Sequence, residues 1–95
     1  MKQGQYLIKG HAVQHALKEG FDRNHMVEVV LYGTVIEEYE GQRSLICGKV
    51  KLEDSTDIYL HLICEYADPV YVEFVTAYIP DPDEWEKPPL KRRHN

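Results

Sequence analysis

The segments that decide the fold are IYLHLIC, residues 58–64, and VYVEFVTAYI, residues 70–79. Both are rich in β-branched and aromatic residues, a composition that favours β-strands. Alternate side chains of a strand point to opposite faces, so each segment holds one proton-transfer group, His61 or Tyr78, at a fixed position on a sheet. These segments therefore predict a sheet with one face against an apolar core and a second face that can carry chemistry.

Working outward from these segments, a two-residue periodicity begins at Thr34. It predicts strands over residues 34–39, 44–52, 57–65 and 70–79, with turn-forming residues between them. Short connections favour antiparallel pairing of consecutive strands, because a parallel crossover needs a longer connection. We therefore expect a four-stranded antiparallel meander.

The segment before Thr34 has helical spacing instead. Apolar residues recur at three- and four-residue intervals over 11–19 and 23–32, and a glycine, Gly20 or Gly33, follows each stretch. Residues 5–9 are expected to form a short extended lead-in. The order predicts an α+β fold in which two N-terminal helices pack on one face of the four-stranded antiparallel meander sheet.

The length of 95 residues fits a single domain. Prolines are frequent after Tyr78 and cannot continue a sheet. We expect Trp85 to fold back onto the domain as a plug. The predicted organisation is one domain over residues 1–88, followed by a flexible basic tail over residues 89–95.

Composition narrows the classes of function. No apolar run approaches the roughly 20 residues that span a bilayer, and the N-terminus lacks a signal-peptide core, so we expect a cytoplasmic protein with no membrane partner. Two cysteines, Cys47 and Cys64, lie in apolar stretches and are expected to be buried thiols. The formal net charge of −5 argues against indiscriminate nucleic-acid binding, so an RNA-binding chain would need a local basic patch.

His61 is the first candidate for chemistry. If Leu60 and Leu62 face the core, His61 lies on the opposite face of its strand. Imidazole suits proton transfer because its pKa lies near neutral pH. A strand histidine held by one hydrogen bond explains the same pattern without catalysis.

His11, His15 and Lys18 share one stripe of the first predicted helix. Two histidines one turn apart can bind a metal, but the His-Glu-x-x-His form and an obvious third ligand are absent. A polar helix face or a face that contacts phosphate are the other interpretations. Phosphate-binding glycine loops, zinc cysteine sets and calcium loops are also absent, so we predict neither a metal nor a cofactor.

Three further candidates lie on the predicted strands and their turns. Arg43 falls in the first strand-to-strand turn, where its guanidinium could bind a phosphate or remain solvated. Thr76 and Tyr78 share one face of the last strand, where Tyr78 could orient a phosphate or cover the core edge. Glu37 and Glu38 point to opposite faces, so they are interpreted as solvated edge residues and not as a catalytic pair.

The order of these features resembles a known family over residues 6–86. The matching residues are His11-Ala12 at a helix start, His15, Lys18–Phe21 at the helix end, and the stretches 33–39, 60–63 and 75–85. The chain is similar in these to a bacterial family of unknown function grouped with RelE- and MqsR-like toxins. The resemblance implies the barnase, colicin and RelE type of ribonuclease fold. It also implies a metal-independent endoribonuclease toxin with an antitoxin partner, often a zinc-finger protein.

One departure weakens the presumed phosphate site, because the family usually has arginine where this chain has His15. The leading hypothesis is an endoribonuclease in which His61 and His11 exchange protons with RNA, Arg43 stabilises the phosphate, and Tyr78 positions the strand. His15, Lys18 and Thr76 are the expected substrate contacts. The hypothesis requires the four catalytic groups to meet in one cleft. The alternative is a non-catalytic protein-interaction module or an inactive toxin homologue.

Overall fold

The computed structural model describes residues 6–66 and 70–92, and the elements within them form an α+β fold. The α+β class and the two helices are therefore confirmed. In chain order the elements are β1 (Tyr6–Ile8), α1 (Gly10–Glu19), α2 (Arg23–Tyr32), β2 (Thr34–Tyr39), β3 (Arg43–Lys51), β4 (Asp57–Glu65) and β5 (Val72–Tyr78).

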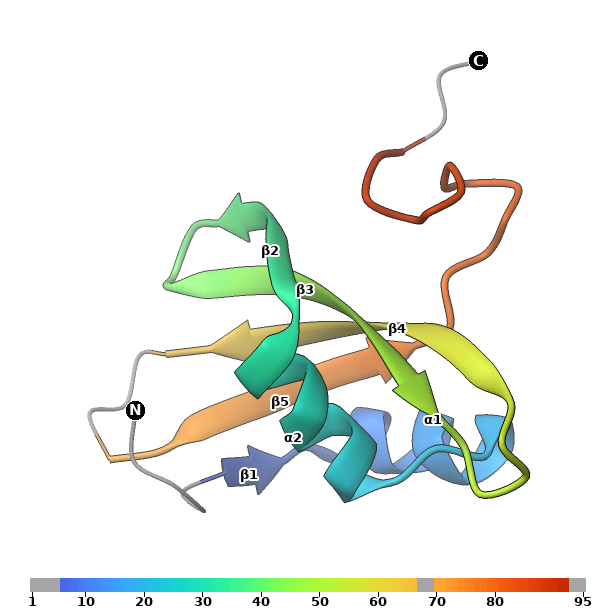
Figure 1. The fold of residues 1–95 in the computed structure, drawn as a ribbon. Coiled ribbons are helices and arrows are strands. Elements are labelled where there is room, and N and C mark those ends of the chain that lie inside the picture. Colours follow the sequence, from blue (N-terminus) through green and yellow to red (C-terminus); the bar gives the residue numbers. More distant parts are fainter. Residues whose placement is uncertain (1–5, 67–69, 93–95) are drawn as a thin grey trace.

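The sheet has five strands in the order β1-β5-β4-β3-β2 (Figure 1). Strands β2 to β5 form the predicted antiparallel meander. The expectation of a four-stranded, purely antiparallel sheet is wrong, because β1 pairs in parallel with β5 and makes the sheet mixed. The periodicity did not reveal β1 because it has only three residues. Its pairing is continued by the Lys9 N–H, which donates to the Phe74 carbonyl.

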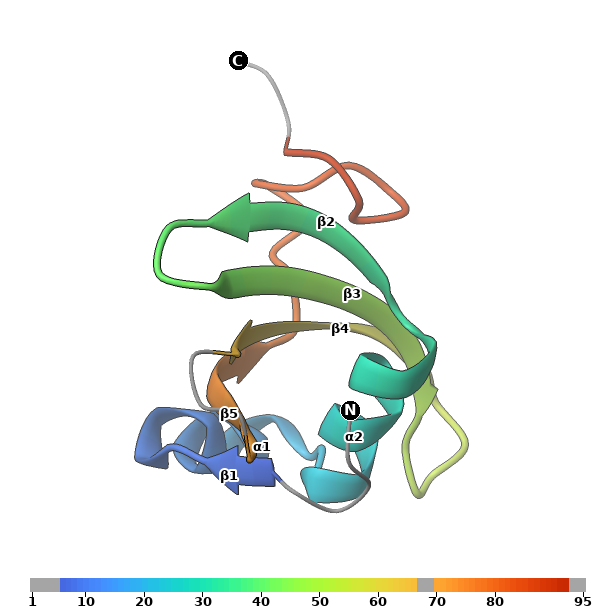
Figure 2. The ribbon, with the colours of Figure 1, turned by 90° about the vertical axis from the view of Figure 1, so that its left-hand side faces the viewer.

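Both helices lie on one face of the sheet, as predicted (Figure 2). Helix α1 packs against β5, and α2 packs against β3 and β4. Asp22 caps α2 by accepting hydrogen bonds from the backbone N–H groups of Asn24 and His25. Gly20 ends α1 in the left-handed conformation, at φ 85°. Gly33 ends α2 for another reason: a Cβ there would lie 2.7 Å from the Cys47 carbonyl oxygen.

The core fills the space between the helices and the sheet, with Phe74, Leu60 and Leu62 fully buried in it. Since Leu60 and Leu62 face the helices, His61 between them projects from the other face, as predicted. Across the sheet, His61 lies opposite Cys47 on one side and Tyr78 on the other.

Residues 80–92, called the C-terminal segment below, lie over the face of the sheet away from the helices (Figures 1 and 2). Trp85 is 3% exposed, so its prediction as a plug is confirmed. Residues 89–95 were expected to form a flexible tail. Within that range, the Pro89 carbonyl is hydrogen-bonded to His61 and the Arg92 side chain to Glu37, and residues 93–95 lie outside the described residues. Across the described parts of the chain, neither helix has the length and apolar character needed to cross a membrane.

Candidate active site

His61 is fully buried under the C-terminal segment, with both ring nitrogens hydrogen-bonded. Its Nε2 lies 2.8 Å from the carbonyl oxygen of Pro89, which can only accept, so Nε2 carries a proton. The Tyr78 hydroxyl lies 3.2 Å from Nδ1 and donates to it when the ring is neutral. Burial lowers the pKa of His61, and it outweighs the Pro89 carbonyl and Glu37, which act to raise that pKa. The covered histidine is therefore neutral at pH 7.

Two aromatic rings enclose the imidazole. Trp85 stands perpendicular to His61 with ring centroids 4.4 Å apart, and Tyr78 lies edge-on with centroids 5.3 Å apart. Burial raises the pKa of Tyr78 to about 12, so its hydroxyl stays protonated. The imidazole can therefore meet a substrate only after Trp85 and Pro89 move away from it.

Glu37 of β2 forms a second polar group on the same face. Its carboxylate accepts two hydrogen bonds from Arg92, one from Nε at 2.9 Å and one from Nη2 at 3.1 Å. It accepts a third from the Tyr39 hydroxyl. Arg92 also lies 4.6 Å above the Trp85 ring. The hydrogen bonds from Arg92 are the main cause that lowers the pKa of Glu37, which is ionised at neutral pH. Glu37 acts to raise the pKa of His61, and His61 acts to lower the pKa of Glu37.

The structure brings several of the predicted residues together around Tyr78. Tyr78 contacts His61, and it also lines a pocket of about 320 Å³ with His15 and Lys18 of α1. Thr76 lies two positions earlier on β5, opposite Ile63 of β4. The same pocket is lined by three carboxylates, Glu19, Asp81 and Glu84, which oppose an anionic ligand in this arrangement.

Arg43 and His11 do not join this group. Arg43 pairs with Glu65 at 2.8 Å and lies four positions along β3 from Cys47, the residue opposite His61, or roughly 13 Å away at the usual strand rise. His11 is exposed at the start of α1, with its ring 6.0 Å from that of His15. Of the four groups that the hypothesis required in one cleft, only His61 and Tyr78 are in contact.

Sequence reasoning missed Glu37 and Arg92. Strand alternation places Glu37 on the open face, and that signal was present, but an edge carboxylate is usually solvated. Arg92 lies in a segment without helix or strand, so no periodicity relates it to Glu37, 55 positions earlier. Within 6–66 and 70–92, no set of three or more His, Cys, Asp or Glu side chains is arranged to hold a metal ion.

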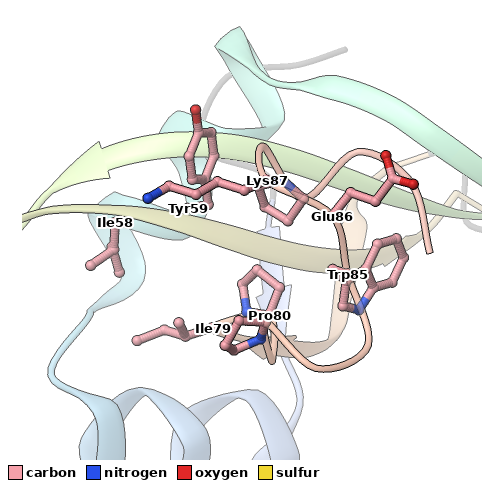
Figure 3. Close-up of a pocket in the computed structure, with 9 residues that line it drawn as sticks. Ile58, Tyr59, Ile79, Pro80, Trp85, Glu86 and Lys87 are labelled. Carbon is pink, nitrogen blue, oxygen red and sulfur yellow. The ribbon is translucent and has the colours of Figure 1, made fainter. Parts of the chain in front are cut away.

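A second pocket, of about 300 Å³, lies where the C-terminal segment meets the ends of β4 and β5 (Figure 3). Ile58 and Tyr59 of β4 form one wall, and Ile79, Pro80 and Trp85 form part of the other. The segment is therefore not closely packed against the sheet along this flank.

Residues 8–79 match the family model described as a domain of unknown function, DUF4258, and the chain belongs to that family. The expected membership of a family of unknown function is thus confirmed. No curated protein and no solved structure matches the chain. The matched region contains Glu37, His61 and Tyr78, and it ends before Trp85 and Arg92.

Proposed function

We propose that this domain is a metal-independent endoribonuclease in which Glu37 and His61 are the acid–base pair. The observation that carries the proposal is the convergence of a carboxylate, an imidazole and a phenol from β2, β4 and β5 on one face of the sheet. Glu37 and His61 stand on strands separated only by β3, and their partners Leu45 and Cys47 lie two positions apart on it, so their backbones are roughly 12 Å apart.

The reaction follows from the charge states. Glu37, ionised, accepts the proton of the ribose 2′-hydroxyl while the 2′-oxygen forms a bond to phosphorus. The bond from phosphorus to the 5′-oxygen breaks, and protonated His61 gives its proton to that oxygen. The products are a 2′,3′-cyclic phosphate and a 5′-hydroxyl. Solvent then removes the proton from Glu37 and returns one to His61.

Neighbouring groups supply the positioning. The Tyr78 hydroxyl, which is protonated at neutral pH, would donate a hydrogen bond to a phosphate oxygen. Lys18 and His15 line the adjoining pocket and would contact the next phosphate of the strand. Arg43 has no catalytic role in this scheme, because it is paired with Glu65 near the far end of β3.

Protonation of His61 requires an uncovered ring. Burial is the main cause of its lowered pKa, so contact with water brings the pKa back toward the ordinary value of 6.5. Glu37 gains basicity in the same way when Arg92 leaves it, because the Arg92 hydrogen bonds are what lower its pKa most. Both groups are therefore more reactive with the C-terminal segment displaced.

The test is cleavage of a 5′-labelled single-stranded RNA, with and without a chelator, by the wild-type chain and by a variant carrying Trp85→Ala and Arg92→Ala. We expect products with 2′,3′-cyclic phosphate ends, and no cleavage of the same sequence with 2′-O-methyl groups. His61→Gln, which keeps a donor for the Pro89 carbonyl, and Glu37→Gln should each lower the rate by a factor of about 10²–10⁴. Absence of cleavage by both the wild-type chain and the double variant would contradict the proposal.

The resemblance to RelE- and MqsR-like toxins supports a cellular role for this activity. A toxin of that kind would arrest bacterial growth when expressed and would be neutralised by an antitoxin, such as a zinc-finger protein. Expression of the wild-type chain beside Glu37→Gln tests this role, because only an active nuclease should arrest growth. Equal growth of the two strains would exclude the toxin role under those conditions.

A non-catalytic interaction module is the second candidate, and the sealed position of His61 favours it. Both ring nitrogens have partners, as expected for a histidine that only stabilises the fold. On this reading His61→Gln would change the free energy of unfolding and leave every RNA-directed activity at background.

A further inference from the structure

We infer that the C-terminal segment occupies the groove in which a single RNA strand binds, and that it acts as the chain's own competitor for that groove. The identity of the ligand rests on the proposed function.

The segment contacts both members of the proposed acid–base pair. The Pro89 carbonyl accepts from His61, and the Arg92 guanidinium holds the Glu37 carboxylate through two hydrogen bonds. The Trp85 ring stands perpendicular to the His61 ring, with centroids 4.4 Å apart, and covers it. One short stretch of chain therefore blocks both His61 and Glu37 and covers the face of the sheet between them.

The segment also presents carboxylates to the cations that RNA would need. Residues 81–86 hold four acidic side chains and no basic one. Two of them, Asp81 and Glu84, line the pocket that contains His15 and Lys18. These carboxylates occupy the place that the phosphates of an RNA strand would take. They repel a nucleic acid until the segment is displaced.

The segment is separable from the domain that it covers. The family match ends at residue 79, so the groove belongs to the matched region and the cover does not. Within the segment the only strand-like contact is one isolated bridge between Trp85 and Arg92. The pocket beside Tyr59 and Pro80 leaves part of the boundary between the C-terminal segment and the sheet unpacked (Figure 3). Such a segment can open while the sheet stays folded.

The two cysteines report on opening without any RNA. Cys47 lies opposite His61 on β3, 4% exposed, outside the core between the sheet and the helices. Cys64 is fully buried in that core. Displacement of the segment should expose Cys47 and leave Cys64 protected, and mass spectrometry after timed reaction with a thiol reagent distinguishes the two.

The experiment compares the full chain with its Trp85→Ala/Arg92→Ala variant, and binding is measured by anisotropy of a labelled 2′-O-methyl RNA that cannot be cleaved. We expect the variant to react at Cys47 at least tenfold faster and to bind RNA at least tenfold more tightly. Lys91→Ala is the matched control, because it removes the same charge from the neighbouring exposed position. It should behave like the wild-type chain.

Three results would overturn the inference: a reactive Cys47 without tighter RNA binding, a wild-type chain that binds as tightly as the variant, or a Cys47 that stays protected. If both cysteines of the double variant react, the variant has unfolded, and Arg92→Ala alone then decides by the same criteria with a severalfold effect. Tighter binding of 2′-O-methyl RNA without cleavage of unmodified RNA would overturn the nuclease and leave this inference standing.

Discussion

Both faces of the sheet contain buried residues, but the kinds of residue differ. The helix-covered face is packed with apolar side chains such as Leu62 and Phe74. The other face carries His61, Glu37 and Tyr78 beneath a segment that has no helix or strand. Apolar packing stabilises a fold without directional requirements, whereas buried polar groups add little net stability and are costly when left unpaired. The helix-covered face therefore stabilises the fold, and the other face is the one whose covering segment can be displaced.

Two leucines make this comparison quantitative, because Leu62 and Leu45 are both fully buried on opposite faces of the sheet. We expect Leu62→Ala to lower the free energy of unfolding by about 3–5 kcal/mol, since the helices cannot close the cavity. Leu45→Ala should cost less, about 2–3 kcal/mol, because the C-terminal segment can shift into the space. Chemical denaturation followed by circular dichroism measures both. Equal losses would show that the segment is as firmly packed as the helices.

Lowering the pH should displace the C-terminal segment from the His61 face before it disrupts the helix-covered face. Burial lowers the pKa of His61 below 6.5, so the uncovered state binds more protons once the pH falls below that value. Above pH 6.5 it costs no free energy to keep His61 neutral beneath the C-terminal segment. This free-energy cost grows as the pH falls from 6.5 toward the lowered pKa of His61. The contact between Glu37 and Arg92 lowers the pKa of Glu37 from 4.5, so its stabilising effect is lost only as the pH falls below 4.5 toward that lowered pKa.

The single tryptophan, Trp85, reports this change through its fluorescence between pH 8 and pH 5. We expect a transition below pH 6.5 in the wild-type chain, with the circular dichroism of the sheet unchanged. His61→Gln removes the imidazole beneath Trp85 and should lack the transition. The same pH profile in both chains would mean that other groups control the segment.

The smallest effect is expected from Arg43→Ala. Its ion pair with Glu65 is partly exposed, and such pairs contribute about 0–1 kcal/mol. RNA cleavage should stay within about twofold of the wild-type rate, because Arg43 does not reach His61. A large loss of cleavage with normal stability would restore Arg43 to the site and contradict the arrangement proposed above.

Periodicity predicted most of the fold because it reflects how strands and helices bury one face. The bounds of β4 and α2 agree with the predicted 57–65 and 23–32, and His61 and Leu62 point to the faces expected of them. Strand β1 was missed as a strand, since three residues are too few for a period and its pairing with β5 depends on the tertiary fold.

The site was only half predictable for a related reason. His61 and Tyr78 lie on regular strands, and their adjacency follows once the register is known. The arginine of the site comes from position 92 and not from position 43, and only folding of an irregular segment brings it to Glu37. Residue type indicated the required chemistry, but it did not indicate which of the chain's arginines would be near the imidazole.

Strand β2 ends the sheet on one side, and this position has a consequence for how copies of the protein meet. An outer strand can pair with the same strand of another molecule and start a growing stack. Glu38 and Glu40, both exposed, give this margin negative charge. Two such margins brought side by side would oppose like charges, which disfavours fibre growth from this end of the sheet.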